Sequence, residues 1–247
     1  MGLWHVFYAD WQMECCGTPF SVGDEVSWPL MLVEADGVLG GGWHDQLSEI
    51  AGPVEDVGGV RVVREETGLT AALAADPDSE EDRRPKPGDR IRSAGLLSVE
   101  RHGAVWPQVE GRVRAVQVLS QVYAESAPGS RSWEPVRGER GRGLRAVDRC
   151  PKWFTKAEAE GERGADGRRR RSREPGVVVA LDVPGTDSRL SQAVREARGI
   201  PHQDAQPGAE TEGLAAADLA DLLHTLSTVA VPRARPGRSG GRRRRHA

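Results

Sequence analysis

The chain has 247 residues, of which 38% are hydrophobic and 46 are glycine or proline, a composition typical of turns and short strands rather than long helices. Three cysteines exclude a disulfide framework, and no apolar run approaches the roughly 20 residues that a bilayer-spanning helix needs. The first residues also lack the basic and apolar regions of a signal peptide. We therefore expect a cytoplasmic protein without a membrane partner.

The charges are divided unevenly along the chain. Residues 1–150 carry 24 acidic and 16 basic side chains, whereas residues 151–247 carry 13 acidic and 18 basic ones. A polyanion would be repelled by the first region and attracted only by the second. Arginine outnumbers lysine 31 to 3, which is typical of a protein from a GC-rich genome. A DNA-binding protein usually uses lysine as well, because lysine also binds phosphate, so the arginine count is poor support for DNA binding.

The first third of the chain is expected to form two strands and one short helix. Residues 3–11 are apolar and aromatic enough for an opening strand, and residues 25–33 alternate between apolar and polar side chains. Pro29 interrupts the second run, so that strand should lie at an edge or carry a bulge. Residues 43–51 repeat apolar side chains at helical spacing and are followed by Gly-Pro, which predicts a short helix.

Five further strands are predicted in the remainder of the β-rich region, at about 59–66, 90–99, 111–123, 143–149 and 176–183. The apolar positions change phase within the third of these runs, which predicts a β-bulge. An acidic stretch at 76–89, where like charges repel, is expected to be a solvated loop. Seven short strands with glycine-rich turns predict a mainly β fold, either a small barrel or a sandwich.

The C-terminal third combines two predicted helices with segments of low complexity. Residues 188–198 and 214–228 each place apolar side chains on one helical stripe. Residues 158–175 and 229–247 are rich in arginine and glycine, and we expect a disordered insertion and a disordered basic tail there.

These elements predict three regions. A β-rich domain should occupy residues 1–184, a helical appendage residues 185–228, and the basic tail the remainder.

The opening of the chain carries a resemblance to a known family. The segment from Trp11 to Phe20 reads Trp-Gln-Met-Glu-Cys-Cys-Gly-Thr-Pro-Phe, and with the run to Trp28 it resembles the opening of an uncharacterised family from high-GC bacteria, a domain of unknown function. Residues 111–113 and 148–154 are similar to that family as well, so the likeness covers roughly residues 3–184. The resemblance implies a domain boundary there and a bacterial cytosol, and it implies no activity, ligand or catalytic residue.

The three cysteines, Cys15, Cys16 and Cys150, are the candidates for metal or redox chemistry. Thiolates bind zinc or act as nucleophiles when their pKa is lowered. Adjacent cysteines in an extended chain point apart, unlike the Cys-x-x-Cys pairs of zinc sites, so no metal is favoured, although His5 and His44 could complete a site in space. The favoured interpretation is structural: the Cys15–Cys16 pair forms a buried turn that packs against the segment around Cys150.

The tryptophans are expected in the core or lining a pocket. Four of the seven lie in the stretch before residue 61, which has no lysine or arginine, whereas a base-stacking groove needs cations beside its aromatic rings. If a ligand pocket exists, we expect Trp11 and Trp28 to line it together with Cys15 and Cys16.

Two arginine runs are the candidates for binding a polyanion: Arg168, Arg169, Arg170 and Arg171, and Arg242, Arg243, Arg244 and Arg245. Such runs attract nucleic acid through its phosphates. The favoured interpretation is nevertheless a solvated linker and tail.

The chain contains no Gly-x-Ser-x-Gly, Walker or Gly-x-Gly-x-x-Gly motif, so catalysis stays open and no cofactor is predicted. The leading hypothesis is a non-enzymatic binding or regulatory module with a protein or small-ligand partner. The alternatives are a thiol-based metal or redox site, and nucleic-acid binding through the arginine-rich segments.

Overall fold

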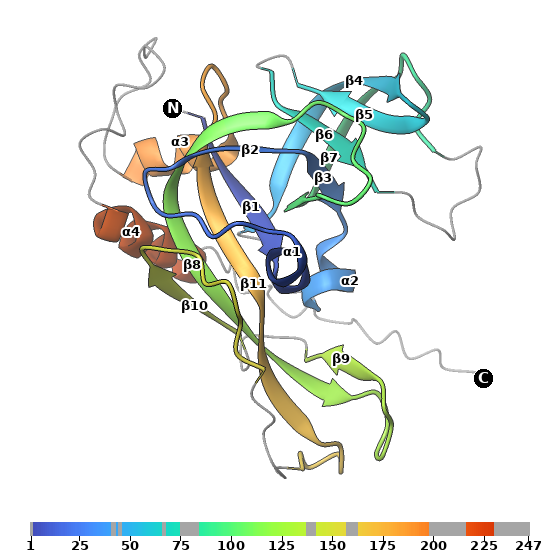
Figure 1. The fold of residues 1–247 in the computed structure, drawn as a ribbon, viewed down its shortest axis with the longest axis vertical. Helices are drawn as coiled ribbons and strands as arrows, with labels where there is room; N and C mark the ends of the chain where they lie inside the picture. The colour runs from blue at the N-terminus through green and yellow to red at the C-terminus, as the bar shows by residue number, and fades with distance from the viewer. Residues whose placement is uncertain are drawn as a thin grey trace, which may run out of the picture.

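The strands form one continuous network that closes on itself at one end (Figure 1). The computed structural model describes residues 2–40, 43, 46–65, 68–74, 84–136, 142–156, 163–197 and 216–229. A five-strand barrel closes through the pairings of β3 (Leu30–Val33), β6 (Thr70–Leu73), β5 (Val60–Arg64), β4 (Ser48–Val57) and β7 (Arg90–Val99). The prediction of a mainly β, barrel-like fold is confirmed.

A curved sheet extends from the barrel. Strand β7 pairs in parallel with β1 (Leu3–Ala9), and β1 pairs antiparallel with β11 (Arg170–Asp182), which lies beside β8 (Val109–Glu125). Three short strands pair with successive stretches of β8, namely β2 (Glu25–Trp28), β10 (Arg142–Val147) and β9 (Trp133–Pro135). Figure 1 shows β8 and β11 running together well past the barrel, to the end where β9 lies.

Four described helices cover this sheet and the barrel: α1 (Asp10–Cys15), α2 (Ala35–Leu39), α3 (Arg189–Ala197) and α4 (Ala216–Val229). The last two confirm the predicted C-terminal helices. Their apolar side chains pack on the outer face of the sheet, where Val194, Leu219 and Leu223 meet Leu3 and Ala180. Of the helices that the structure describes, none has the length and apolar content needed to cross a membrane.

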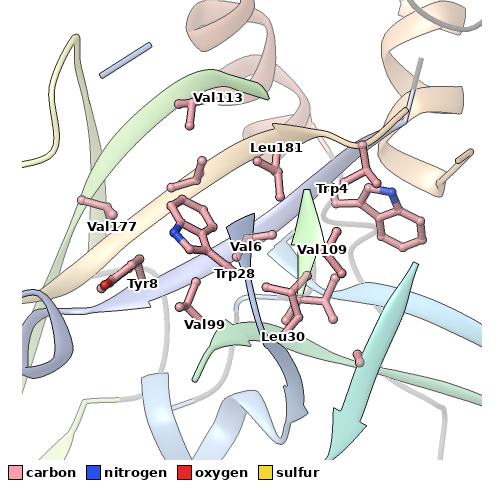
Figure 2. Packing of buried hydrophobic residues seen from close by; sticks show 14 of the residues in the cluster. Trp4, Val6, Tyr8, Trp28, Leu30, Val99, Val109, Val113, Val177 and Leu181 are labelled. Carbon is pink, nitrogen blue, oxygen red and sulfur yellow. The ribbon is translucent and has the colours of Figure 1, made fainter. Parts of the chain in front are cut away.

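The main core lies between the curved sheet and the barrel. Alternate side chains of β1, Trp4, Val6 and Tyr8, belong to this core together with Trp28 and Leu30, and Figure 2 shows Trp28 near Val6 and Tyr8. The intervening side chains of β1 face a second cluster and the C-terminal helices. Because β1 is buried on both faces, its sequence is apolar at every position except His5 rather than alternating.

The predicted strand at 25–33 is in fact two strands. Pro29 lies between β2, which pairs with β8, and β3, which pairs with β7 and β6. A proline has no N–H to continue a ladder, so the chain passes there from the curved sheet into the barrel. On the apolar face of this run Trp28, Leu30 and Leu32 are buried, and Val26 is half-buried against the same core.

The predicted helix at 43–51 is wrong, because residues 48–57 form strand β4. Buried and half-buried side chains alternate from Ser48 onward, as pairing with β7 and β5 requires. Gly52 is not a helix stop. A Cβ at Gly52 would lie 2.0 Å from the carbonyl oxygen of Arg64, so glycine permits a close backbone approach within the barrel.

The predicted disorder of 158–175 is wrong for its described part. Strand β11 begins at Arg170 and pairs with the end of β8, and an isolated bridge joins Arg163 to Arg169. The predicted bulge is confirmed, since Arg114 is the extra residue where the register against β11 shifts. Residues 76–83 of the acidic loop, and residues 157–162 and 230–247, lie outside the described residues.

Candidate metal centre

Helix α1 is fixed at both ends by cations from distant segments. The strand predicted at 3–11 ends at Ala9, and α1 starts at Asp10, whose buried carboxylate accepts a hydrogen bond from Arg173 of β11 at 2.5 Å. At the other end, Lys152 donates to the carbonyls of Met13 (2.7 Å) and Gly17 (3.0 Å). Carbonyls at a helix end have no intrahelical partner, so Lys152 supplies one.

The chain turns sharply beneath α1 after Cys16. The backbone N–H groups of Cys16 and Gly17 both donate to the carbonyl of Gln12, at 3.0 and 2.9 Å. A Cβ at Gly17 would lie 2.7 Å from the hydroxyl oxygen of Tyr8 and equally close to Met13, so this turn requires glycine. The turn leaves Cys15 and Cys16 exposed. The prediction that these two cysteines are buried is therefore wrong.

A buried glutamine holds a second segment against α1. The side-chain amide of Gln12 donates to the carbonyl of Val99 at 2.7 Å and accepts from the N–H of Arg101 at 2.9 Å. The next N–H, that of His102, donates to the carboxylate of Glu100 at 2.7 Å. The segment that follows β7 is therefore positioned by both hydrogen-bonding groups of one side chain from the helix.

This arrangement brings two thiols and one imidazole together. His102 Nε2 lies 3.8 Å from Cys15 Sγ and 3.6 Å from Cys16 Sγ, and the three atoms all lie within 4.8 Å of one another. Trp11, which is 51% exposed, stacks on the imidazole with ring centroids 5.1 Å apart. Glu100 faces the other ring nitrogen, Nδ1, at 4.0 Å. These contacts orient the imidazole so that Nε2 points at the thiols.

The three thiols have different surroundings. Desolvation raises the pKa of Cys16 above its ordinary value, and neighbouring Cys15 raises it further, while Arg101 and Lys152 oppose this shift. Complete burial raises the pKa of Cys150 to about 12. Thiolates are the reactive form of cysteine, so we expect the Cys150 thiol to be inert at neutral pH.

Comparison with known proteins assigns the chain to a family. Residues 2–183 match the sequence profile of a family of unknown function, DUF6578. The chain belongs to this family. The match confirms the predicted resemblance to an uncharacterised domain. No curated protein and no solved structure matches the chain. All residues of the thiol–imidazole cluster lie inside the DUF6578 region, whereas α3 and α4 lie beyond it.

The structure brings together three of the four pocket residues predicted from the sequence. Trp11, Cys15 and Cys16 share one surface of the DUF6578 domain. Trp28 lies instead in the main core, edge-on to Tyr8 with ring centroids 5.5 Å apart. Of the other tryptophans, Trp4, Trp43 and Trp106 are buried as expected, whereas Trp153 is exposed.

Cys150 does not join the cluster. Its N–H donates to the carbonyl of Phe20 at 2.8 Å, so the segment around Cys150 does pack against the chain that follows α1, as predicted. The thiol itself belongs to the core. His5, suggested above as a completing ligand, is buried in β1, and His44 lies outside the described residues.

The ligand that sequence reasoning missed is His102. It lies 86 residues from Cys16, and nothing in the local pattern connects the two. The link is the parallel pairing of β1 with β7, which places the C-terminal ends of both strands at the same edge of the sheet. That pairing is a tertiary feature without a sequence motif.

The first arginine run has partners within its own part of the domain: Arg168 and Arg170 face Asp166, Arg169 pairs with Glu125, and Arg171 lies over the ring of Trp133 at 4.3 Å. Hydrogen bonds from the backbone N–H and the guanidinium of Arg169, together with one from the N–H of Gly129, lower the pKa of buried Glu125 to about 2. Polyanion binding by this run stays a prediction. Arg242–Arg245 lie outside the described residues.

Proposed function

We propose that this DUF6578 domain is a non-enzymatic module that binds a thiophilic transition-metal ion, zinc(II) first, through Cys15, Cys16 and His102. The observation that supports this is the donor spacing. Zinc–sulfur bonds of about 2.3 Å and zinc–nitrogen bonds of about 2.0–2.1 Å at a tetrahedral angle separate sulfur from nitrogen by roughly 3.6 Å. The two sulfur–nitrogen distances of 3.6 and 3.8 Å are close to that value.

The position on α1 favours a bound cation over a catalytic thiol. A helix N-terminus, where N–H groups stabilise a thiolate, is one of the settings that make a cysteine nucleophilic. Cys15 and Cys16 are instead at the C-terminal end of α1, where carbonyl oxygens gather and attract positive charge. Lys152 binds the carbonyls of Met13 and Gly17 at this end of the helix. A metal ion beside the thiols would be attracted by the same carbonyl dipoles.

The surroundings of the cluster resemble those that orient metal ligands in proteins. A ligating histidine commonly has a carboxylate near its second ring nitrogen, and Glu100 occupies that position at His102. Gln12 fixes the separation between the thiols and the imidazole before any ion binds. Because the ligands must be free thiols, we place the protein in a reducing compartment such as the cytoplasm.

Metal binding by the full chain tests this proposal. Zinc titrated against a chromophoric chelator under reducing conditions should bind at about one equivalent. Mutating a residue that only hydrogen-bonds a metal ligand typically lowers metal affinity about 10–100-fold. Removing a direct ligand should lower it more, so we expect Cys15→Ala, Cys16→Ala and His102→Ala each to lower zinc affinity by at least about 100-fold.

His224→Ala is the matched control, because His224 is an exposed histidine on α4, far from the cluster in sequence. Its zinc affinity should equal that of the unaltered chain. A wild-type chain that binds zinc no more tightly than the His102→Ala variant contradicts the proposal.

A further inference from the structure

The candidate metal centre supplies one ligand fewer than a tetrahedral ion needs. Structural zinc sites have four protein ligands, whereas open sites have three and leave one position to an outside molecule. In the described part of the chain, the cluster consists of Cys15, Cys16 and His102. Two carboxylates nearby have other partners: Glu100 accepts the N–H of His102, and Glu14 binds Lys156 at 2.6 Å.

The remaining coordination position is accessible to solvent. All three ligand residues are exposed, so an ion held by them would lie at the surface and not in the core. Trp11 stacks on a face of the imidazole ring, so it does not block the ring plane in which Nε2 faces the two thiols. A small molecule could therefore reach the fourth position without any movement of the fold.

The charge around the site favours an anion at that position. Two thiolates and a neutral imidazole balance the charge of a divalent ion. Lys152 Nζ binds the carbonyls of Met13 and Gly17, which flank the two cysteines in the sequence, and Arg101 directly precedes His102, while Glu100 lies on the Nδ1 side of the imidazole. Thiolate is a soft ligand that suits zinc, so a further sulfur donor would match the two that the chain supplies.

We infer that the fourth ligand is an exogenous low-molecular-weight thiolate, so that the Cys15–Cys16–His102 site holds a metal–thiolate adduct rather than the ion alone. The inference rests on the proposed function. In the binding step the incoming thiol loses its proton to solvent, its sulfur forms a bond to the ion, and a bound water leaves. No electron is transferred, and neither cysteine changes its oxidation state.

Cobalt(II) substitution of the full chain tests the inference, because cobalt absorption reports both the geometry and the number of sulfur ligands. Adding 2-mercaptoethanol to the anaerobic cobalt-loaded protein should raise the sulfur-to-cobalt charge-transfer absorption about 1.5-fold, since the thiolates increase from two to three. The change should saturate at one thiol per cobalt. Ethylene glycol, the oxygen analogue, should leave the spectrum unchanged.

Two arginine variants provide a matched pair. Arg101→Gln should weaken the affinity of the cobalt protein for 2-mercaptoethanol several-fold, whereas Arg112→Gln should not. Arg112 is an exposed arginine on β8 that pairs with Glu25, at the other end of the sheet from α1.

Three results would overturn the inference. A four-coordinate cobalt spectrum that ignores added thiol would mean that the chain supplies the fourth ligand. Cobalt-dependent dimerisation in sedimentation velocity would mean that a second copy supplies it. Failure of cobalt to bind at all would overturn the proposed function together with the inference, and this outcome differs from the first two because no cobalt–sulfur absorption would appear.

Discussion

Ending the chain after Gly185, which removes α3 and α4, is expected to lower the free energy of unfolding by about 3–5 kcal/mol. These helices bury Leu3, Ala115 and Ala180 on the outer face of the curved sheet, and burying a leucine alone contributes roughly 1.5–3 kcal/mol. The truncation also removes Thr186 and Ser191, which accept hydrogen bonds from Trp4 Nε1 and from the N–H of Leu3, both at 2.8 Å. Each such bond contributes about 0.5–1.5 kcal/mol.

Urea unfolding followed by far-ultraviolet circular dichroism measures this cost. We expect the truncated chain to keep its sheet and to unfold cooperatively, because the eleven strands in the described part of the chain all precede Gly185. Leu223→Ala should cost about 2–4 kcal/mol because its side chain is buried, whereas the neighbouring exposed change His224→Ala should cost less than about 0.5 kcal/mol. An unchanged urea midpoint after truncation would show that the helices add nothing to the stability of the sheet.

Replacing Arg173 by methionine is expected to cost about 2–4 kcal/mol. The change leaves the carboxylate of Asp10, which is only 2% exposed, without its guanidinium partner at 2.5 Å. Breaking a buried ion pair typically costs about 3–5 kcal/mol, and the value here is lower because one third of the Arg173 side chain is exposed. Since Asp10 begins α1, the same change should also weaken zinc binding at the other end of the helix.

Two companion variants separate charge from packing. Asp10→Asn combined with Arg173→Met removes both charges and should be less destabilising than Arg173→Met alone. Arg168→Ala removes a half-buried arginine whose partner, Asp166 on the hairpin that leads into β11, is 39% exposed, and should cost less than about 1 kcal/mol. If Arg173→Met and Arg168→Ala lower the free energy of unfolding equally, the Asp10–Arg173 pair has no special role in stability.

The fold class followed from local pattern, and the errors occurred where long-range pairing overrode it. Apolar alternation and glycine-rich turns are local properties, so they predicted most strands, the bulge in β8 and both C-terminal helices. The apolar spacing at 43–51 suits a helix equally well, and only pairing with β7 and β5 makes it part of β4. The sequence of residues 168–171 is typical of a solvated linker, and only the fold places partners such as Glu125 and Trp133 beside these arginines.

For the candidate site, the sequence by itself determined the chemistry of the donors. Trp11, Cys15 and Cys16 stood out because rare residue types cluster there, and Gly17 marked a turn. Only the tertiary structure decided that the two thiols are exposed at the end of a helix and that His102 faces them. The physical reason is that β1 and β7 pair in parallel, and Gln12 then joins the chain segments that follow the two strands. Contacts across 86 residues depend on which strands pair, and no short window of sequence carries that information.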